Sequence, residues 1–280
     1  MALVHFNFES ECLATNTDVN IILPDKPRDL TPAEFYGNGE KYKVLWLLHG
    51  TFGDYTDWIR KSNIELYACE KDLVVVMPSG NNANYVNWPG FCTGYNAWDY
   101  LFDELMPLVY NWFPASPKRE DNFIAGLSMG GNGALQYAAG HPEKFAAAAI
   151  LSCAPVNLHS IGVPGKASDK ANAAFNRRTQ NIIDNFGGME GYLQSPVNVW
   201  DKLPELIKAG SLPRLYFCIG EDDFLFERYT SFKAYAQGLG LDATFEECPG
   251  YQHEWRFWDL FIQKALTFFG LDENSQGNPF

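Results

Sequence analysis

Short apolar runs that alternate with helical segments place the strongest constraint on how this chain can fold. The runs are rich in β-branched or aromatic side chains and are closed by Gly or Pro, which is typical of buried strands in a parallel sheet. They lie at residues 44–48, 73–77, 122–125, 146–151 and 215–219. Because parallel strands need crossover connections, the pattern predicts an α/β fold with a mostly parallel central sheet and helices on both faces.

Further elements extend this pattern at both ends of the chain. Residues 4–8 and 19–23 are strand-like with no helix between them, so we expect an antiparallel pair at one sheet edge, and residues 243–248 predict another strand. Two amphipathic helices are indicated by apolar residues spaced three and four apart. The first contains Trp98, Leu101, Leu105, Leu108 and Trp112, and the second, after Glu254, contains Trp255, Trp258, Phe261, Ile262, Ala265 and Phe269.

The segment 155–203 differs from the rest, because it contains Gly, Asn, Pro, aromatic residues and short helical stretches but no clear strand. In a wound α/β sheet, such an insertion is usually a cap over the ligand site, and the alternative is a surface excursion without a role. We therefore predict one domain over residues 1–280 with a cap-like insertion at 155–203.

The segment Gly126-Leu127-Ser128-Met129-Gly130-Gly131 joins the predicted strand 122–125 to a helix-like stretch. A strand, a tight turn and a helix around G-x-S-x-G form a nucleophile elbow, in which small residues allow close packing around a strained serine. The motif alone occurs by chance in Gly-rich chains, but this context makes Ser128 the candidate nucleophile.

A serine hydroxyl needs a base to activate it and an acid to orient that base. Three carboxylates, Glu221, Asp222 and Asp223, follow the predicted strand 215–219, and Asp223 is the preferred acid with the other two as alternatives. His253 lies on a loop 30 residues further on, in the order Ser, Asp, His, and is the candidate base. His5, His141 and His159 have no comparable context.

The tetrahedral intermediate of acyl transfer carries a negative oxygen that requires two backbone N–H donors. Met129, directly after the candidate nucleophile, is expected to supply one donor. The turn after strand 44–48, Gly50-Thr51-Phe52-Gly53, is expected to supply the other through the Thr51 N–H. We expect His49 to shape this turn and to transfer no proton.

Composition limits the partners and the location of the protein. The net charge is −13, so phosphate-rich partners are disfavoured and nucleic acid is a poor candidate. A basic group of Lys166, Lys170, Arg177 and Arg178 could attract an anion, although a solvated charge cluster is the simpler interpretation. No run of transmembrane length and no secretory leader is evident, and the six cysteines resemble reduced core thiols. We therefore expect a cytoplasmic protein with no membrane partner.

The sequence resembles the esterase D and tributyrin esterase branch of the α/β-hydrolases, which includes feruloyl esterases, acetylesterases and S-formylglutathione hydrolases. The matching stretches extend over nearly the whole chain. They are Leu47-Leu48-His49-Gly50, Met77-Pro78-Ser79-Gly80, Asp103-Glu104-Leu105, Gly126-Leu127-Ser128-Met129-Gly130-Gly131, Asn185-Phe186-Gly187-Gly188, Asp223-Phe224-Leu225, His253-Glu254-Trp255 and Trp258-Asp259. The resemblance favours Asp223 over Asp222, because the acid of the family directly precedes the Phe-Leu pair.

The resemblance implies a serine carboxylesterase that hydrolyses small acyl esters and requires no metal or organic cofactor. Gly50-Thr51-Phe52-Gly53 departs from the Gly-Leu-Thr-Cys of S-formylglutathione hydrolases, which makes a glutathione thioester less favoured. An acyltransferase and a non-catalytic binding scaffold are the alternatives. Family members often form oligomers, so a homo-oligomer is expected by analogy alone. Aromatic residues are predicted to line the substrate site, namely Phe52, Trp58, Tyr85, Trp88, Phe91 and Phe224.

Overall fold

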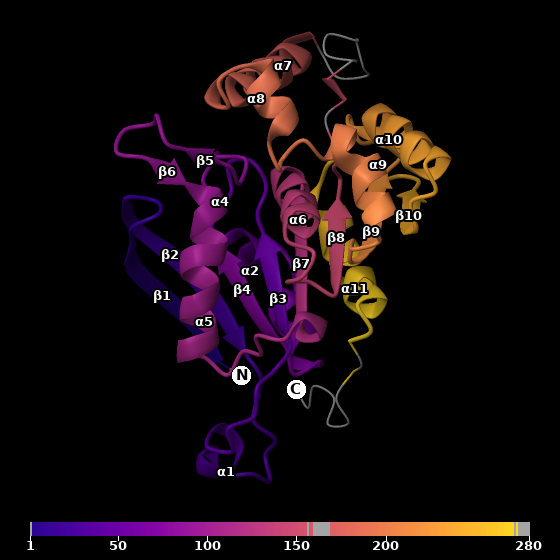
Figure 1. Cartoon of the computed structure of the whole chain (residues 1–280). Helices are drawn as coiled ribbons and strands as arrows, with labels where there is room; N and C mark the ends of the chain where they lie inside the picture. Colours follow the sequence, from indigo (N-terminus) through magenta and orange to yellow (C-terminus); the bar gives the residue numbers. More distant parts are fainter. Residues whose placement is uncertain (1, 156, 159–168, 272, 274–280) are drawn as a thin grey trace.

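The centre of the molecule is an eight-stranded sheet with the order β1-β2-β4-β3-β7-β8-β9-β10 (Figure 1). This computed structural model describes residues 2–155, 157–158, 169–271 and 273, and the side chains of 169–175 are not described. The strands are β1 (Ala2–Ser10), β2 (Thr15–Leu23), β3 (Val44–Leu48), β4 (Val74–Pro78), β7 (Asn122–Leu127), β8 (Ala147–Leu151), β9 (Arg214–Gly220) and β10 (Ala243–Cys248). All pairings from β4 to β10 are parallel, whereas β1 and β2 run antiparallel at one edge, so the predicted sheet is confirmed.

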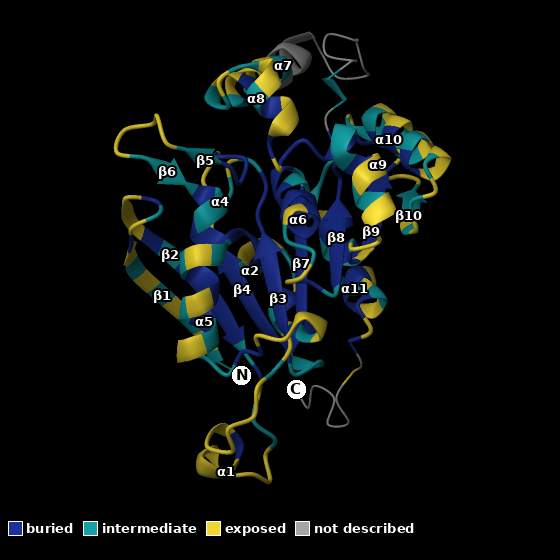
Figure 2. Cartoon of the chain, viewed as in Figure 1, coloured by how far each residue is buried: buried dark blue, intermediate teal, exposed yellow. Residues whose placement is uncertain are grey.

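Two hydrophobic clusters cover the two faces of this sheet. In β3, alternate residues contribute to opposite clusters, because successive side chains of a strand point to opposite faces. Val44, Trp46 and Leu48 belong to one cluster, and Leu45 and Leu47 belong to the other. All five are fully buried, which explains why this strand is apolar throughout and does not alternate with polar residues (Figure 2).

Helices pack on both faces, as predicted. One face carries α2 (Asp57–Lys61), α3 (Ile64–Cys69) and α11 (Trp255–Phe268). The other face carries α4 (Ala97–Asp99), η1 (Tyr100–Leu105), α5 (Met106–Trp112), α6 (Met129–Gly140), α9 (Val199–Ala209) and α10 (Phe226–Gly238). Smaller elements lie outside these layers: α1 (Pro32–Tyr36), η2 (Arg119–Asp121), and the hairpin of β5 (Asn87–Trp88) and β6 (Tyr95–Asn96). Within the described residues, no helix is both long and apolar enough to cross a membrane.

The helical stretch 97–112 departs from the predicted spacing in its second half. Its middle segment, η1, is a π-helix, in which hydrogen bonds join residues five apart. The wider turn shifts the buried face by about one residue. Met106 and Val109 are therefore buried, whereas Trp112 is 64% exposed. The prediction that Trp112 lies on the apolar face was wrong for this reason.

The segment between β8 and β9 is helical where it is described. It contains α7 (Asp169–Asn185) and α8 (Met189–Gln194), which lie beyond the carboxyl ends of the parallel strands in Figure 1. Its predicted end at residue 203 was wrong, because α9 packs its buried residues Val199, Trp200 and Leu203 into the main core. The helices α7 and α8 have the position expected of a cap, and their covering role stays a prediction.

The six cysteines are free, as expected of reduced thiols. Cys153 and Cys218 are buried, and burial raises the pKa of Cys153 to about 12. That thiol is therefore protonated at neutral pH and is a poor nucleophile. Cys92 is exposed, so the prediction of core thiols was wrong for this residue.

Candidate active site

Ser128 lies between β7 and α6 with φ +53° and ψ −116°, a conformation that L-residues rarely adopt. Close packing holds this backbone in place. The Ser128 N–H donates to the Leu151 carbonyl at 2.8 Å. A Cβ on Gly126 would lie 2.3 Å from the Gly130 carbonyl oxygen, and a Cβ on Gly130 would lie 2.5 Å from the carbonyl oxygens of Leu48 and His49. Both motif glycines are thus required by sterics, as the predicted elbow implies.

Three predicted side chains meet beside this elbow. His253 Nε2 lies 3.0 Å from Ser128 Oγ, and His253 Nδ1 lies 2.8 Å from Asp223 Oδ2. The second carboxylate oxygen, Oδ1, accepts the Leu225 N–H at 2.8 Å. The structure therefore pairs His253 with Asp223, and the two alternative carboxylates, Glu221 and Asp222, are not its partners.

This arrangement determines which nitrogen of His253 can accept a proton. A carboxylate only accepts hydrogen bonds, so Nδ1 carries the proton that Asp223 binds, and Nε2 presents a lone pair to the Ser128 hydroxyl. The Asp223 side chain is fully buried, whereas that of His253 is 17% exposed. The imidazole lies between aromatic rings, with ring centroids 4.6 Å from Phe224 and 5.0 Å from Trp258. The base is therefore oriented by the acid and by packing.

The two candidate oxyanion donors come from the start of α6 and from the turn after β3. Met129 is the first residue of α6, so its N–H belongs to the first turn, where no intrahelical acceptor is available. Thr51 lies in the turn 50–53, which is closed by the Gly53 N–H donating to the Gly50 carbonyl at 3.2 Å. A Cβ on Gly50 would lie 3.6 Å from the Ser128 Cβ, so this turn lies directly against the elbow.

His49 joins the turn 50–53 to the segment after β4. Its Nδ1 lies 2.7 Å from the Gly50 carbonyl, and its Nε2 accepts the Gly80 N–H at 2.8 Å. Because Nε2 must accept, Nδ1 carries the proton and donates to Gly50. Burial lowers the pKa of this imidazole, which favours the neutral form that these two bonds require. His49 thus has a structural position without contact to Ser128 Oγ, in agreement with the predicted role.

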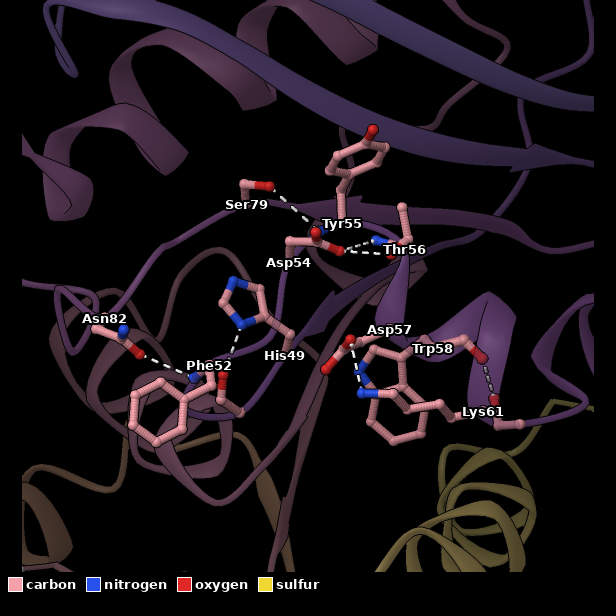
Figure 3. Close-up of polar contacts among 12 residues, drawn as sticks. His49, Phe52, Asp54, Tyr55, Thr56, Asp57, Trp58, Lys61, Ser79 and Asn82 are labelled. Carbon is pink, nitrogen blue, oxygen red and sulfur yellow. Dashed lines mark hydrogen bonds and ion pairs between the residues drawn. The ribbon is translucent and has the colours of Figure 1, made fainter.

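Two more contacts fix the loop after β3, as Figure 3 shows. Asn82 Oδ1 accepts the Phe52 N–H at 2.8 Å, and Ser79 Oγ accepts the Tyr55 N–H at 3.2 Å. Phe52 has a φ of +64°, so its backbone, like that of Ser128, is held in a sparsely populated region. Asn82 was missed by the sequence analysis, because an isolated Asn in a loop gives no signal of what it bonds.

The predicted substrate-lining residues divide into two groups. Phe52 is 90% exposed and Phe224 is 46% exposed, and both lie beside the elements that hold the site. Phe91 is exposed, and Trp88 is half-buried with its Nε1–H bonded to the Ala83 carbonyl at 2.8 Å.

Trp58 and Tyr85 are core residues, which corrects their predicted place in the substrate site. Trp58 is 1% exposed, and its Nε1–H donates to the Leu48 carbonyl at 3.1 Å. Tyr85 is 3% exposed, and its hydroxyl donates to the His49 carbonyl at 3.0 Å. Both side chains stabilise the strand end and turn that precede Thr51, so their influence on the site is indirect.

Arg178 lies near the site and belongs to the basic group that the sequence analysis named as able to attract an anion. It extends from α7 to the turn 50–53, where Nη1 donates to Thr51 Oγ1 at 2.9 Å. In the sequence it belongs to a basic group that was interpreted as solvated. Arg178 contacts Thr51 only in the folded protein, because the two residues are 127 positions apart in the sequence.

Comparisons with known proteins identify related esterases. The profile of the Esterase family, described as "Putative esterase", matches residues 10–267. An acetyl esterase of Caldicellulosiruptor saccharolyticus is 32% identical over 272 residues, covering 96% of this chain and 98% of the relative. Two Staphylococcus aureus structures each align with 96% of this chain, and each alignment includes 98% of the Staphylococcus aureus chain. They are the substrate-bound fluorophosphonate-binding serine hydrolase FphF, with a TM-score of 0.75 and 28% identity, and the S-formylglutathione hydrolase FrmB, with a TM-score of 0.74 and 27% identity.

Fold and comparisons together define a serine esterase of the α/β-hydrolase fold, and the predicted resemblance to the esterase D branch is confirmed. More particularly, the chain belongs to the Esterase family. It is a carboxylic ester hydrolase.

Proposed function

We propose that Ser128, His253 and Asp223 form the catalytic triad of a serine carboxylesterase that cleaves small acyl esters. The observation that carries this proposal is the continuous hydrogen-bonded chain from Ser128 Oγ through His253 to Asp223, at 3.0 and 2.8 Å. Nucleophile, base and orienting acid in mutual contact are the arrangement that acyl transfer to a serine requires.

In the proposed reaction, His253 Nε2 takes the hydroxyl proton as Ser128 Oγ attacks the ester carbonyl. The N–H groups of Thr51 and Met129 bind the oxyanion of the tetrahedral intermediate. Collapse of this intermediate breaks the bond to the alcohol, which leaves with the proton from His253. Water then attacks the acyl-enzyme, with His253 again taking and returning one proton, so that acid is released and Ser128 is regenerated.

An acetyl or another short acyl group is the substrate that the comparisons support best, because a relative matched over nearly its whole length is an acetyl esterase. The exposed rings of Phe52 and Phe224 could also contact a flat feruloyl or cinnamoyl group. The similarity to an S-formylglutathione hydrolase supports a thioester as the alternative substrate.

Hydrolysis of a panel of esters by the wild-type protein and by Ser128→Ala tests this proposal. The panel contains matched acetyl, butyryl and feruloyl esters and S-formylglutathione. We expect the highest kcat/KM for an acetyl ester and loss of turnover with every substrate in the variant. A preference for S-formylglutathione would replace the substrate assignment, and unchanged turnover by Ser128→Ala would refute the mechanism.

Two further alternatives can be separated with the same protein. An acyltransferase would transfer the acyl group to an added alcohol faster than to water, so the ratio of ester to acid product decides between the two activities. A binding scaffold would turn over none of the substrates. We also propose a cytoplasmic location on the basis of the free cysteines, and fractionation of the source cells tests it.

A further inference from the structure

Arg178 occupies an unusual position for a charged side chain. It lies on α7 between the exposed Arg177 and the buried Thr179, and it is itself partly buried. Its Nη1 donates to Thr51 Oγ1 at 2.9 Å, which places the guanidinium against the turn that holds a proposed oxyanion donor. A group bound by Arg178 would therefore lie next to the reacting carbonyl.

The charge of Arg178 has no compensating carboxylate among the described residues. Burial lowers the pKa of the guanidinium, and no acidic group among the described residues acts in the opposite direction. An arginine nevertheless remains protonated at neutral pH. Taking an unpaired cation out of water is costly, so this position needs an explanation beyond packing.

The bond to Thr51 does not supply that explanation. The hydroxyl is neutral, and a glutamine amide could make the same hydrogen bond without the cost of burying a charge. A guanidinium has five N–H donors in a planar fork, and the bond to Thr51 uses one of them. The remaining donors have the geometry that binds a carboxylate through two parallel hydrogen bonds.

We propose that Arg178 binds a carboxylate carried by the ester substrate, beside the turn 50–53. This inference rests on the proposed function and narrows its substrate class to esters with an anionic group near the scissile bond. Because the net charge of the whole chain is −13, its overall field repels anions, and selective binding of one requires a local cation of this kind.

Two pairs of substrates test the inference, each pair differing only in charge. Monomethyl succinate and methyl succinamate place a carboxylate or an amide on the acyl side, whereas 4-acetoxybenzoate and 4-acetoxybenzamide place them on the alcohol side. The quantity measured is the ratio of kcat/KM for the charged ester to that for its neutral partner. We expect the wild-type protein to favour the charged ester in one pair, and the preference to shrink at high salt because ions screen the attraction.

The variants assign this preference to one residue. Arg178→Gln should lower the ratio by roughly 10- to 100-fold, the range expected for hydrogen bonds between charged groups, and Arg178→Lys should restore part of it. Arg177→Gln is the matched control, because it removes the same charge from an exposed position one residue away and should keep the wild-type ratio.

Other outcomes overturn the inference. A wild-type protein without preference for the charged ester in either pair would contradict it, as would an equal loss of the ratio in Arg177→Gln and Arg178→Gln. If the neutral esters are cleaved but no charge preference exists, this inference fails while the proposed function stands. If no ester is cleaved at all, the proposed function itself fails.

Discussion

At the scale of single residues, hydrogen bonds to both carboxylate oxygens fix the position of the Asp223 side chain. Asp223 lies shortly after the end of β9, and its side chain is fully buried. Its two carboxylate oxygens accept separate hydrogen bonds from Leu225 and His253. The neighbouring Asp222 is exposed and bonds only through its backbone N–H, to the Tyr251 carbonyl, among the contacts described. Adjacent carboxylates of the same turn therefore have different surroundings.

Substituting these two aspartates separately tests that difference. Asp223→Asn should lower kcat by roughly 10³- to 10⁴-fold, because an amide no longer selects the histidine tautomer that leaves Nε2 free. Asp222→Asn is the matched control and should remain near the wild-type rate. Steady-state kinetics on an acetyl ester give both values. If the Asp222 variant lost as much activity as the Asp223 variant, the assignment of the acid would be wrong.

His49 gives a prediction for stability against pH. Burial lowers its pKa in the folded state below the usual value of about 6.5, so the unfolded chain binds more protons below that pH. The stability that neutral His49 contributes is therefore complete above pH 6.5 and is lost as the pH falls, by at most about 1.4 kcal/mol per pH unit.

In His49→Gln, an amide can still accept from Gly80 and donate to Gly50, but it does not titrate. Urea unfolding at pH 7.5 and at pH 5.5 should therefore show a smaller loss of stability in the variant than in the wild-type protein. An equal loss in both would show that His49 does not contribute to the acid sensitivity.

At the scale of elements, the elbow between β7 and α6 depends on backbone groups that approach each other closely. A Cβ at position 126 would overlap the Gly130 carbonyl, and neither segment can withdraw because each is packed in the core. Gly126→Ala should therefore cost about 1–3 kcal/mol or more in the free energy of unfolding and should also lower activity.

Gly238→Ala in α10 is the matched control for this substitution. A Cβ there meets nothing within 4 Å, and the glycine lies in a helix, so alanine should stabilise the protein by up to about 1 kcal/mol. Thermal unfolding of both variants gives the comparison. A Gly126→Ala protein as stable as the control would contradict the proposed tight packing of the elbow.

The spacing of apolar residues predicted the regular strands and helices correctly, but it did not predict the irregular part of a helix. The eight strands of the central sheet and the helix α11 were predictable, because their apolar residues recur at the spacing of a strand or a helix. The exposed Trp112 was not, since the π-helix η1 changes the period within one continuous helical stretch.

At the scale of the whole molecule, sequence alone identified most of the candidate site. Ser128, Asp223 and His253 follow different parallel strands, and the carboxyl ends of such strands lie at one edge of the sheet, so chain order was enough to bring them together. Tertiary packing determines that Trp58 and Tyr85 point into the core. It also determines that Arg178 contacts Thr51. No local pattern of residues encodes those contacts.

The central claim is that Ser128 is the nucleophile, and labelling with a fluorophosphonate tests it most directly. The protein is titrated with the probe, residual hydrolysis of an acetyl ester is followed, and the modified peptide is mapped by mass spectrometry. We predict one phosphonyl group per chain, bound to Ser128 Oγ, with activity lost in proportion to labelling. Full activity in the presence of an excess of probe, or inactivation with the label on another residue, would contradict the account.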